Sequence, residues 1–308
     1  MIFRIKKFYK QPFIVLQFKK ITPDDIKIIE PFILNDKSAV SDRTLGVVYL
    51  FRDYYSYCIE SDTLFLKSEL ENNEGFLPPM YLSGDGDLFS DLKKIKDYAG
   101  NNNTEAKICY LTEEEAEKIK ELFNGSDPEF NRDYSDYFYD KEALLTLKGK
   151  HLSGQRNFIN RFKKNYPEYR TEKLSEENIW RIDKFLTEYY VKREKASELF
   201  KDEKKNVFEF LNHVKSFGFL TLALFAGDEP VAFSVGEIRE NVLFVHEEKA
   251  DASIKGSYQM IVNEFVKTYA NENVTYINRE DDSGDEGLRI SKESYHPAFL
   301  LNKFSVKI

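Results

Sequence analysis

The residues best suited to chemistry gather in one segment, residues 277–297. Its side chains mix carboxylates, basic groups and an amide around two glycines: Asn278, Arg279, Glu280, Asp281, Asp282, Asp285, Glu286, Arg289 and Lys292. Arg279, Arg289 and Lys292 can orient a carboxylate or a phosphate, and Asn278 can polarise a carbonyl group. The competing interpretation is a charged loop that only faces solvent.

The elements around this segment favour a site. An alternating apolar run at residues 274–277 predicts a strand before it, and residues 288–292 predict a short amphipathic helix within it. A strand fixes the backbone, and a glycine-containing loop projects functional groups at the end of that strand. Tyr295, His296 and Pro297 close the segment.

A metal site is a weaker interpretation of the same segment. Asp281, Asp282, Asp285 and Glu286 offer hard oxygen ligands, but their spacing lacks the alternate-residue order of a calcium loop. The four histidines have no zinc spacing, and neither a glycine-rich phosphate loop nor a serine nucleophile elbow occurs. We therefore expect no metal.

Composition predicts a folded, aromatic-rich protein that is long enough for two domains. The chain has 308 residues, of which 42% are hydrophobic and 32% charged. It has no apolar run of bilayer length, and its first residues lack the order of a secretory signal, which predicts a cytoplasmic location. Cys58 and Cys109 lie in apolar runs and are expected to be buried and reduced.

Charge is distributed unevenly. A net charge of −8 argues against broad, sequence-independent binding of nucleic acid. Between residues 141 and 170, however, eight lysines and arginines face only two glutamates. This basic segment can hold an anionic ligand, with Lys150, Arg156 and Asn157 as candidates, or it can be a solvated helix face. The sequence leaves the two interpretations open.

Periodicity predicts an α+β chain. In the first half we expect strands at 45–51, 54–60, 63–66, 80–82 and 107–111, with helices at 87–98 and 112–123. In the second half we expect helices at 155–165, 175–195, 207–217 and 256–270. A meander of strands at 219–225, 231–238 and 242–245 lies between the last two of these helices. A final strand is expected at 303–308.

This order of elements, with three motifs, resembles a known family. The motifs are KGKHLSGQRNFINRF at 148–162, EEKA at 247–250 with KGSY at 255–258, and INREDDSGDEGLRISKESYHP at 277–297. They resemble bacterial proteins grouped with the C-terminal domain of lysyl-phosphatidylglycerol synthase. The resemblance implies two tandem GNAT-like domains, each a mixed, mostly antiparallel sheet flanked by helices: a degenerate one at 1–147 and one carrying the site at 148–308. Tandem domains of this kind also resemble the peptidoglycan aminoacyltransferases.

The GNAT resemblance implies where a donor binds. In that fold the acyl donor enters a splay between two central strands, and its pyrophosphate rests on the N-terminus of the next helix. Here that seat would be Lys255, Gly256, Ser257 and Tyr258. The usual GNAT pattern has Arg or Gln where this chain has Ser253, and a small residue where it has Tyr258. This departure leaves acyl-CoA, aminoacyl-tRNA or no donor open.

The resemblance also implies catalytic roles. Acyl transfer to an amine needs a general base, for which Glu247, Glu248 and Glu280 are the candidates, and an acid, for which Tyr295 is the candidate. The structural alternatives are an ion pair between Glu248 and Lys249 and a buried Tyr295 with a bonded hydroxyl. The substrate-binding candidates are Lys150, Arg156, Asn157, Asn278, Arg279, Asp282, Arg289 and Lys292.

These expectations define an acyl- or aminoacyl-transferase with an amine or hydroxyl acceptor. The acceptor would be a small molecule or a phospholipid headgroup, and tRNA is a further candidate partner. The alternative is a non-catalytic ligand-binding protein that keeps the GNAT fold. The oligomeric state stays open.

Overall fold

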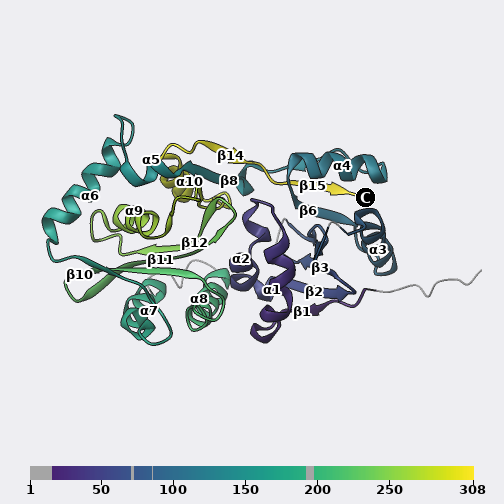
Figure 1. Cartoon of the computed structure of the whole chain (residues 1–308), viewed down its shortest axis with the longest axis horizontal. Helices are drawn as coiled ribbons and strands as arrows, with labels where there is room; N and C mark the ends of the chain where they lie inside the picture. The colour runs from purple at the N-terminus through teal and green to yellow at the C-terminus, as the bar shows by residue number, and fades with distance from the viewer. Residues whose placement is uncertain (1–15, 71–72, 85, 192–197) are drawn as a thin grey trace, which may run out of the picture.

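A computed structural model describes residues 16–70, 73–84, 86–191 and 198–308 (Figure 1). Two predictions concern residues outside this range. One is the absence of a secretory signal at residues 1–7, and the other is the end of the helix expected at 175–195, of which residues 192–195 are not described. Two mixed sheets lie next to each other along the long axis of the molecule, each with helices against it. The expected α+β class is therefore confirmed.

The first sheet has the strand order β1-β2-β3-β4-β6-β15-β7, with β5 paired to β3. Its strands are β1 (Lys19–Lys20), β2 (Tyr55–Glu60), β3 (Thr63–Ser68), β4 (Gly75–Phe76), β5 (Met80–Tyr81), β6 (Lys107–Leu111), β7 (Glu129–Phe130) and β15 (Phe304–Lys307). The helices of this half are α1 (Ile26–Asn35), α2 (Leu45–Leu50), α3 (Leu88–Asn101) and α4 (Glu113–Phe123). The helices expected at 87–98 and 112–123 are α3 and α4.

The second sheet has the order β14-β8-β13-β12-β11-β10-β9. Its strands are β8 (Asp136–Asp140), β9 (Arg170–Glu172), β10 (Leu220–Ala226), β11 (Glu229–Arg239), β12 (Val242–Ala250), β13 (Tyr276–Asn278) and β14 (Phe299–Leu301). The helices are α5 (Lys141–Thr146), α6 (Ser153–Asn165), α7 (Asp183–Val191), α8 (Glu198–Leu211), α9 (Ser257–Tyr269) and α10 (Glu286–Glu293). The antiparallel meander β10-β11-β12 is confirmed.

The two halves exchange strands. Strand β8 precedes residue 147 but pairs with β13 and β14 in the second sheet. Strand β15, at the end of the chain, pairs with β6 and β7 in the first sheet. The division at residues 147 and 148 stays a prediction about folding units, and each sheet contains a strand from the other side of it.

One predicted strand is wrong. Residues 45–51 were expected as a strand, but Leu45–Leu50 form the helix α2. Thr44 caps this helix, because its hydroxyl accepts a hydrogen bond from the Val47 N–H at 3.4 Å. Every residue of α2 is buried. A short helix that is buried on all sides has no polar stripe, so periodicity alone cannot distinguish it from a buried strand.

Two predicted helices have different limits. The helix expected from residue 175 begins as the 3₁₀ helix η5 (Ile179–Ile182) and continues as α7. The helix expected at 207–217 is α8, which ends at Leu211. Turns at residues 212–218 follow it, so Gly218 lies beyond the helix rather than at its end.

Helix α9 and helices α7 and α8 pack on opposite faces of the second sheet. On one face, Ala232 of β11 and Ala250 of β12 share a core with Met260 and Phe265 of α9. On the other face, Val235 joins a core with residues of α7, α8 and the first half of the chain. In Figure 1, α2 lies between this second face and the first sheet. The position of α2 brings the first half of the chain next to the central strands.

Candidate active site

The site begins where two central strands diverge. Strands β12 and β13 are parallel neighbours over three residue pairs, from Val242 with Tyr276 to Phe244 with Asn278. Strand β12 then continues to Ala250, while the chain leaves β13 into the loop at 279–285. The parallel pairing of β12 and β13 ends at Phe244 and Asn278, and residues 245–250 and 279–282 form the two edges of this divergence, which we call the splay.

A β-bulge in β12 decides which side each residue faces. The register with β11 shifts, so that Val235 pairs with Glu247 while Gly236 pairs with Val245, which leaves His246 as the additional residue. Beyond the bulge, Glu248 lies opposite Ser234. Because residues two apart on a strand share a face, Ser234 and Glu248 lie on the α9 face together with Ala232 and Ala250.

On the α9 face, Glu248 and Arg279 bridge the splay. Glu248 Oε2 accepts hydrogen bonds from Arg279 Nε at 3.0 Å and Nη2 at 2.6 Å. The guanidinium lies 4.8 Å from the ring centre of Tyr295 and 5.7 Å from that of Tyr139. Burial opposes the positive charge of Arg279, but the Glu248 carboxylate outweighs burial and raises the pKa of Arg279.

Tyr295 is buried on this face. Burial raises the pKa of Tyr295, which keeps its phenol protonated at neutral pH. Its hydroxyl has no hydrogen-bond partner among the described residues, in contrast to the bonded hydroxyl of the structural alternative. The neighbouring Tyr139 instead donates its hydroxyl to the Lys292 carbonyl at 2.8 Å.

On the opposite face, His246 lies between two glutamates. Its Nδ1 is 2.8 Å from Glu280 Oε1, and its Nε2 is 3.0 Å from Glu237 Oε1. Burial would lower the pKa of His246, but the two carboxylates raise it to about 9, so the imidazole is positively charged at neutral pH. Burial also raises the pKa of Glu280.

Helix α2 closes this histidine cluster. The Gly46 N–H donates to Glu237 Oε1 at 2.8 Å. A Cβ at Gly46 would collide with the His246 ring, so only glycine allows the helix to approach this closely. Sequence reasoning considered His246 only as a zinc ligand. Its position directly before Glu247 and Glu248 is the signal that could have identified it.

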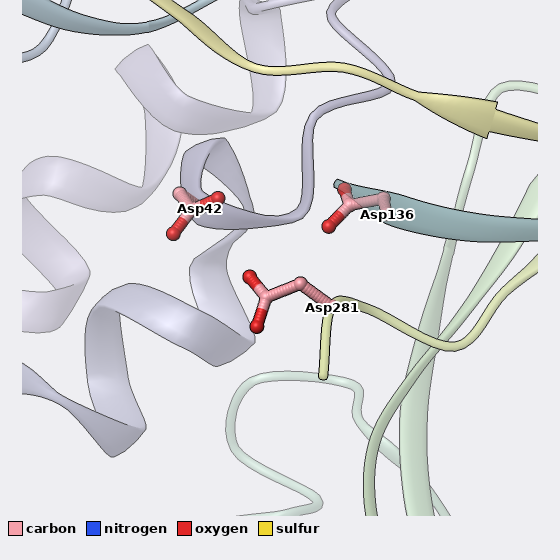
Figure 2. A group of neighbouring side chains, drawn as sticks. All are labelled: Asp42, Asp136 and Asp281. Atoms are coloured by element: carbon pink, nitrogen blue, oxygen red, sulfur yellow. The ribbon is translucent and has the colours of Figure 1, made fainter. Parts of the chain in front are cut away.

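A second buried cluster lies between the two halves of the chain. Asp42, Asp136 and Asp281 come from three separate segments and point toward one another (Figure 2). Lys303 Nζ lies between them, 2.6 Å, 2.9 Å and 2.8 Å from their respective carboxylate oxygens. These three carboxylates could hold a metal ion by their spacing, but here the lysine ammonium supplies the positive charge. Burial raises the pKa of Asp42 to about 7 although Lys303 opposes this shift.

Asp282 and Asp285, two acidic residues of the loop at 279–285, each have a structural role. Asp282 accepts hydrogen bonds from Arg289 Nη2 at 2.7 Å and from the Tyr137 hydroxyl at 2.6 Å. Asp285 caps α10 by accepting from the Leu288 N–H at 2.7 Å. Asp282 and Arg289, both expected to bind substrate, therefore bind each other.

Two further substrate-binding candidates also bind within the protein. Lys292 Nζ donates to the carbonyl oxygen of Arg279 at 2.6 Å and to that of Asp281, and burial lowers its pKa. Asn278 donates to Asp136 Oδ2 at 3.0 Å and accepts from the Glu280 N–H at 2.7 Å. Both side chains hold the backbone of the loop. Among the candidates on the loop, Arg279 is the one with a buried side-chain nitrogen, Nη1, that has no partner among the described residues.

The expected pyrophosphate seat at α9 is packed against α6. A Cβ at Gly256 would collide with the Phe158 carbonyl oxygen, and the Ser257 N–H is donated to the Ile254 carbonyl at 3.1 Å. Lys255 is exposed and Tyr258 is half-buried. A carbonyl oxygen beside the helix N-terminus brings partial negative charge to the place where an anion would have to bind.

The remaining candidates differ in availability. Glu247 forms an ion pair with Lys249 at 2.7 Å, so the strand-end pair expected for Glu248 belongs to Glu247 instead. Arg156 donates to the carbonyl oxygens of Leu147 and Gly149, which uses it to hold the turn before α6. The side chains of Lys150 and Asn157 are exposed and make no hydrogen bond to the described residues.

The two mixed sheets, each with helices against it, form an α+β architecture with the parallel β12–β13 pair in the middle of the second sheet. The chain belongs to the family described as phosphatidylglycerol lysyltransferase, C-terminal, whose model matches residues 36–307. In the part of the chain that the structure covers, no helix is long and apolar enough to cross a membrane.

Three similar proteins illustrate this relationship. A conserved protein of unknown function from Bacteroides thetaiotaomicron VPI-5482 has 28% identity and a TM-score of 0.85, over 96% of this chain and 100% of that one. The C-terminal domain of a putative lysylphosphatidylglycerol synthetase from Agrobacterium fabrum has 10% identity and a TM-score of 0.67, over 92% and 91%. An uncharacterised protein of Mycoplasmoides gallisepticum is 27% identical over 176 residues. That match spans 56% of each of the two chains, so it covers about half of the relative's length.

Proposed function

We propose that this protein transfers an acyl or aminoacyl group to an amine or hydroxyl acceptor at the α9 face of the splay. The observation that carries this proposal is the pair formed by Glu248 and Tyr295. Both lie on this face, on either side of Arg279, and each keeps an oxygen free of hydrogen bonds to the described residues. A base and an acid on one face can serve the two ends of a single transfer.

Glu248 is the proposed general base. Arg279 binds only Oε2 of this carboxylate, which leaves Oε1 for the acceptor. As the acceptor nitrogen or oxygen forms a bond to the acyl carbon, Oε1 takes its proton. The bond from the acyl carbon to the donor sulfur or oxygen then breaks, and Tyr295 gives its proton to that leaving atom. Proton exchange with solvent restores both groups.

Glu247 and Glu280 support the site in other ways. Glu247 is paired with Lys249, and Glu280 faces the His246 imidazolium on the opposite side of the sheet. Arg279 holds Glu248 in place across the splay and brings one further N–H toward the reacting group. Asn278, Asp282, Arg289 and Lys292 are proposed to position the loop rather than to contact substrate.

The support for the acceptor and the support for the donor differ in strength. Family membership favours a phospholipid-related acceptor. The packing of Gly256 against Phe158 disfavours a CoA pyrophosphate at the start of α9, which leaves an aminoacyl ester, or a thioester bound in another way. Lys150 and Asn157 are exposed enough to contact an anionic substrate. A cytoplasmic location stays a prediction.

A transfer assay tests the proposal. Purified protein would be mixed with acyl-CoA thioesters or aminoacyl-tRNAs and with phosphatidylglycerol vesicles or small amines, and products would be detected by mass spectrometry. We expect Glu248→Gln and Tyr295→Phe to lower the rate by about a hundredfold or more. Glu272→Gln, at an exposed position, is the matched control.

The same assay distinguishes the transferase from the alternative, a non-catalytic binding protein. The covered start of α9 is the observation that favours a binding protein which keeps the fold without catalysis. If no donor yields product, or if the two variants react at the rate of the unaltered protein, the transferase proposal is wrong and the binding function takes its place.

A further inference from the structure

Five buried polar atoms in the second half of the chain have no hydrogen-bond partner among the described residues, and one of them, Asn206 Oδ1, belongs to α8 on the other face of the second sheet. The remaining four are Gln155 Oε1, Ser234 Oγ, Arg279 Nη1 and Tyr295 Oη. Their residues are 7%, 0%, 7% and 3% exposed. A buried polar group without a partner is destabilising, so native proteins rarely keep several of them close together. Such a group is expected to be satisfied by something that binds.

Contacts within the fold connect these four residues. Gln155 Nε2 donates to the Ser294 hydroxyl at 2.8 Å, and Ser294 directly precedes Tyr295. The Tyr295 ring lies against the Arg279 guanidinium, which binds Glu248. Ser234 lies opposite Glu248 on the neighbouring strand. The residues that carry the unpartnered atoms therefore form a connected series from α6 through Tyr295 and Arg279 to β11.

The hydrogen-bond donors and acceptors among these atoms indicate which kind of ligand fits. Arg279 Nη1 and Tyr295 Oη are donors, whereas Gln155 Oε1 is an acceptor. The charge of Arg279 is already balanced by Glu248, so a second carboxylate would add an uncompensated negative charge to a buried site. A neutral carbonyl group accepts both donated hydrogen bonds without that penalty, and a neighbouring N–H can donate to the glutamine.

We propose that these residues form a binding site for a neutral amide, whose oxygen accepts from Arg279 Nη1 and Tyr295 Oη and whose N–H donates to Gln155 Oε1. The site deepens the proposed function and rests on it, because it specifies that the substrate carries an uncharged amide where it passes Arg279. Ser234 lies at its far end and offers a hydroxyl to the same substrate.

A binding titration tests the site without turnover. The full chain, with carbon-labelled tyrosine, would be titrated with N-methylacetamide, methyl acetate and acetate, and the ring resonances of Tyr295 and Tyr139 followed by NMR. We expect saturable shifts of Tyr295 with N-methylacetamide, and a Kd about tenfold lower than that of acetate. Methyl acetate should bind several-fold more weakly than the amide, because it has no N–H for Gln155.

Matched variants identify the contacts. Tyr295→Phe should raise the Kd of N-methylacetamide about tenfold, whereas Tyr139→Phe, which removes a hydroxyl bonded within the protein, should change it less than about twofold. Gln155→Leu should abolish the difference between the amide and the ester.

Several outcomes would overturn the site. These are acetate binding as tightly as the amide, no shift of Tyr295 at saturating probe, or equal effects of the two tyrosine variants. Amide binding together with a failed transfer assay would keep this site and reject the transferase. Transfer activity without amide binding would keep the transferase and reject this site.

Discussion

Both faces of the splay carry buried charged and polar side chains, but the two faces differ in how fully these side chains are hydrogen-bonded. On the face toward α2, His246 is bonded through both ring nitrogens, and Glu237 also accepts from Gly46. On the face toward α9, Arg279 and Tyr295 each keep a polar atom without a partner. A saturated cluster stabilises the contact between the two halves of the chain, whereas the unpartnered atoms on the α9 face are where we propose that a ligand binds. The structural charges and the proposed functional groups therefore lie on opposite faces of one sheet.

The largest expected effect comes from the structural side. Lys303→Met should lower the free energy of unfolding by about 3–5 kcal/mol, because it leaves Asp42, Asp136 and Asp281 buried without their cation. Urea denaturation measures the change. Lys307→Met removes an exposed pair with Glu105 and should leave the free energy of unfolding almost unchanged. Equal losses in the two variants would contradict a structural role for the Lys303 cluster.

The histidine cluster predicts a pH dependence. The pKa of His246 is about 9 when folded, against 6.5 for an ordinary histidine. Its stabilisation is therefore complete below pH 6.5 and is lost as pH rises toward 9, to the extent of about 3 kcal/mol. Asp42, whose pKa is raised from 3.8 to about 7, contributes stability at low pH that is mostly lost as pH rises to 7, so most of the loss between pH 7 and 9 belongs to His246.

Denaturation at a series of pH values measures this loss. His246→Gln is the informative variant, because it removes the titrating group and should flatten the curve between pH 7 and 9. A slope that survives the substitution would assign the dependence to another group.

A smaller effect is expected at the helix that closes the same cluster. Gly46→Ala places a methyl group against the His246 ring and should destabilise the protein by about 1–3 kcal/mol. Gly100→Ala is the control, since nothing lies within 4 Å of its added Cβ in helix α3, and it should stabilise slightly. Thermal unfolding compares the two, and equal melting temperatures would show that α2 can move away from the cluster.

The smallest expected difference compares the two tyrosines that flank Arg279. Tyr139→Phe loses a hydrogen bond to the Lys292 carbonyl and should cost about 1 kcal/mol of stability. Tyr295→Phe removes a hydroxyl without a partner and should be close to neutral. Chemical denaturation of both variants measures this. A loss at Tyr295 as large as that at Tyr139 would mean that its hydroxyl is satisfied within the protein.

Much of the fold was accessible from local patterns. Period-two runs identified the β10-β11-β12 meander, and the apolar positions of α9 at 260, 261, 265 and 266 are all buried. The placement of the loop at 277–297 after a central strand was also predicted. Helix α2 was missed because burial on every side removes the periodicity on which such predictions depend.

The sequence by itself determined the family, the α+β class and the loop that carries Arg279, Glu280 and Asp281. Only the tertiary structure decided how those charges pair. Lys303 meets Asp42 from 261 positions away in the chain, and a single-residue bulge at His246 decides that Glu248 rather than Glu247 faces Arg279. The physical reason is that burial and pairing depend on distances across the fold. One additional residue in a strand reverses the face of every side chain beyond it.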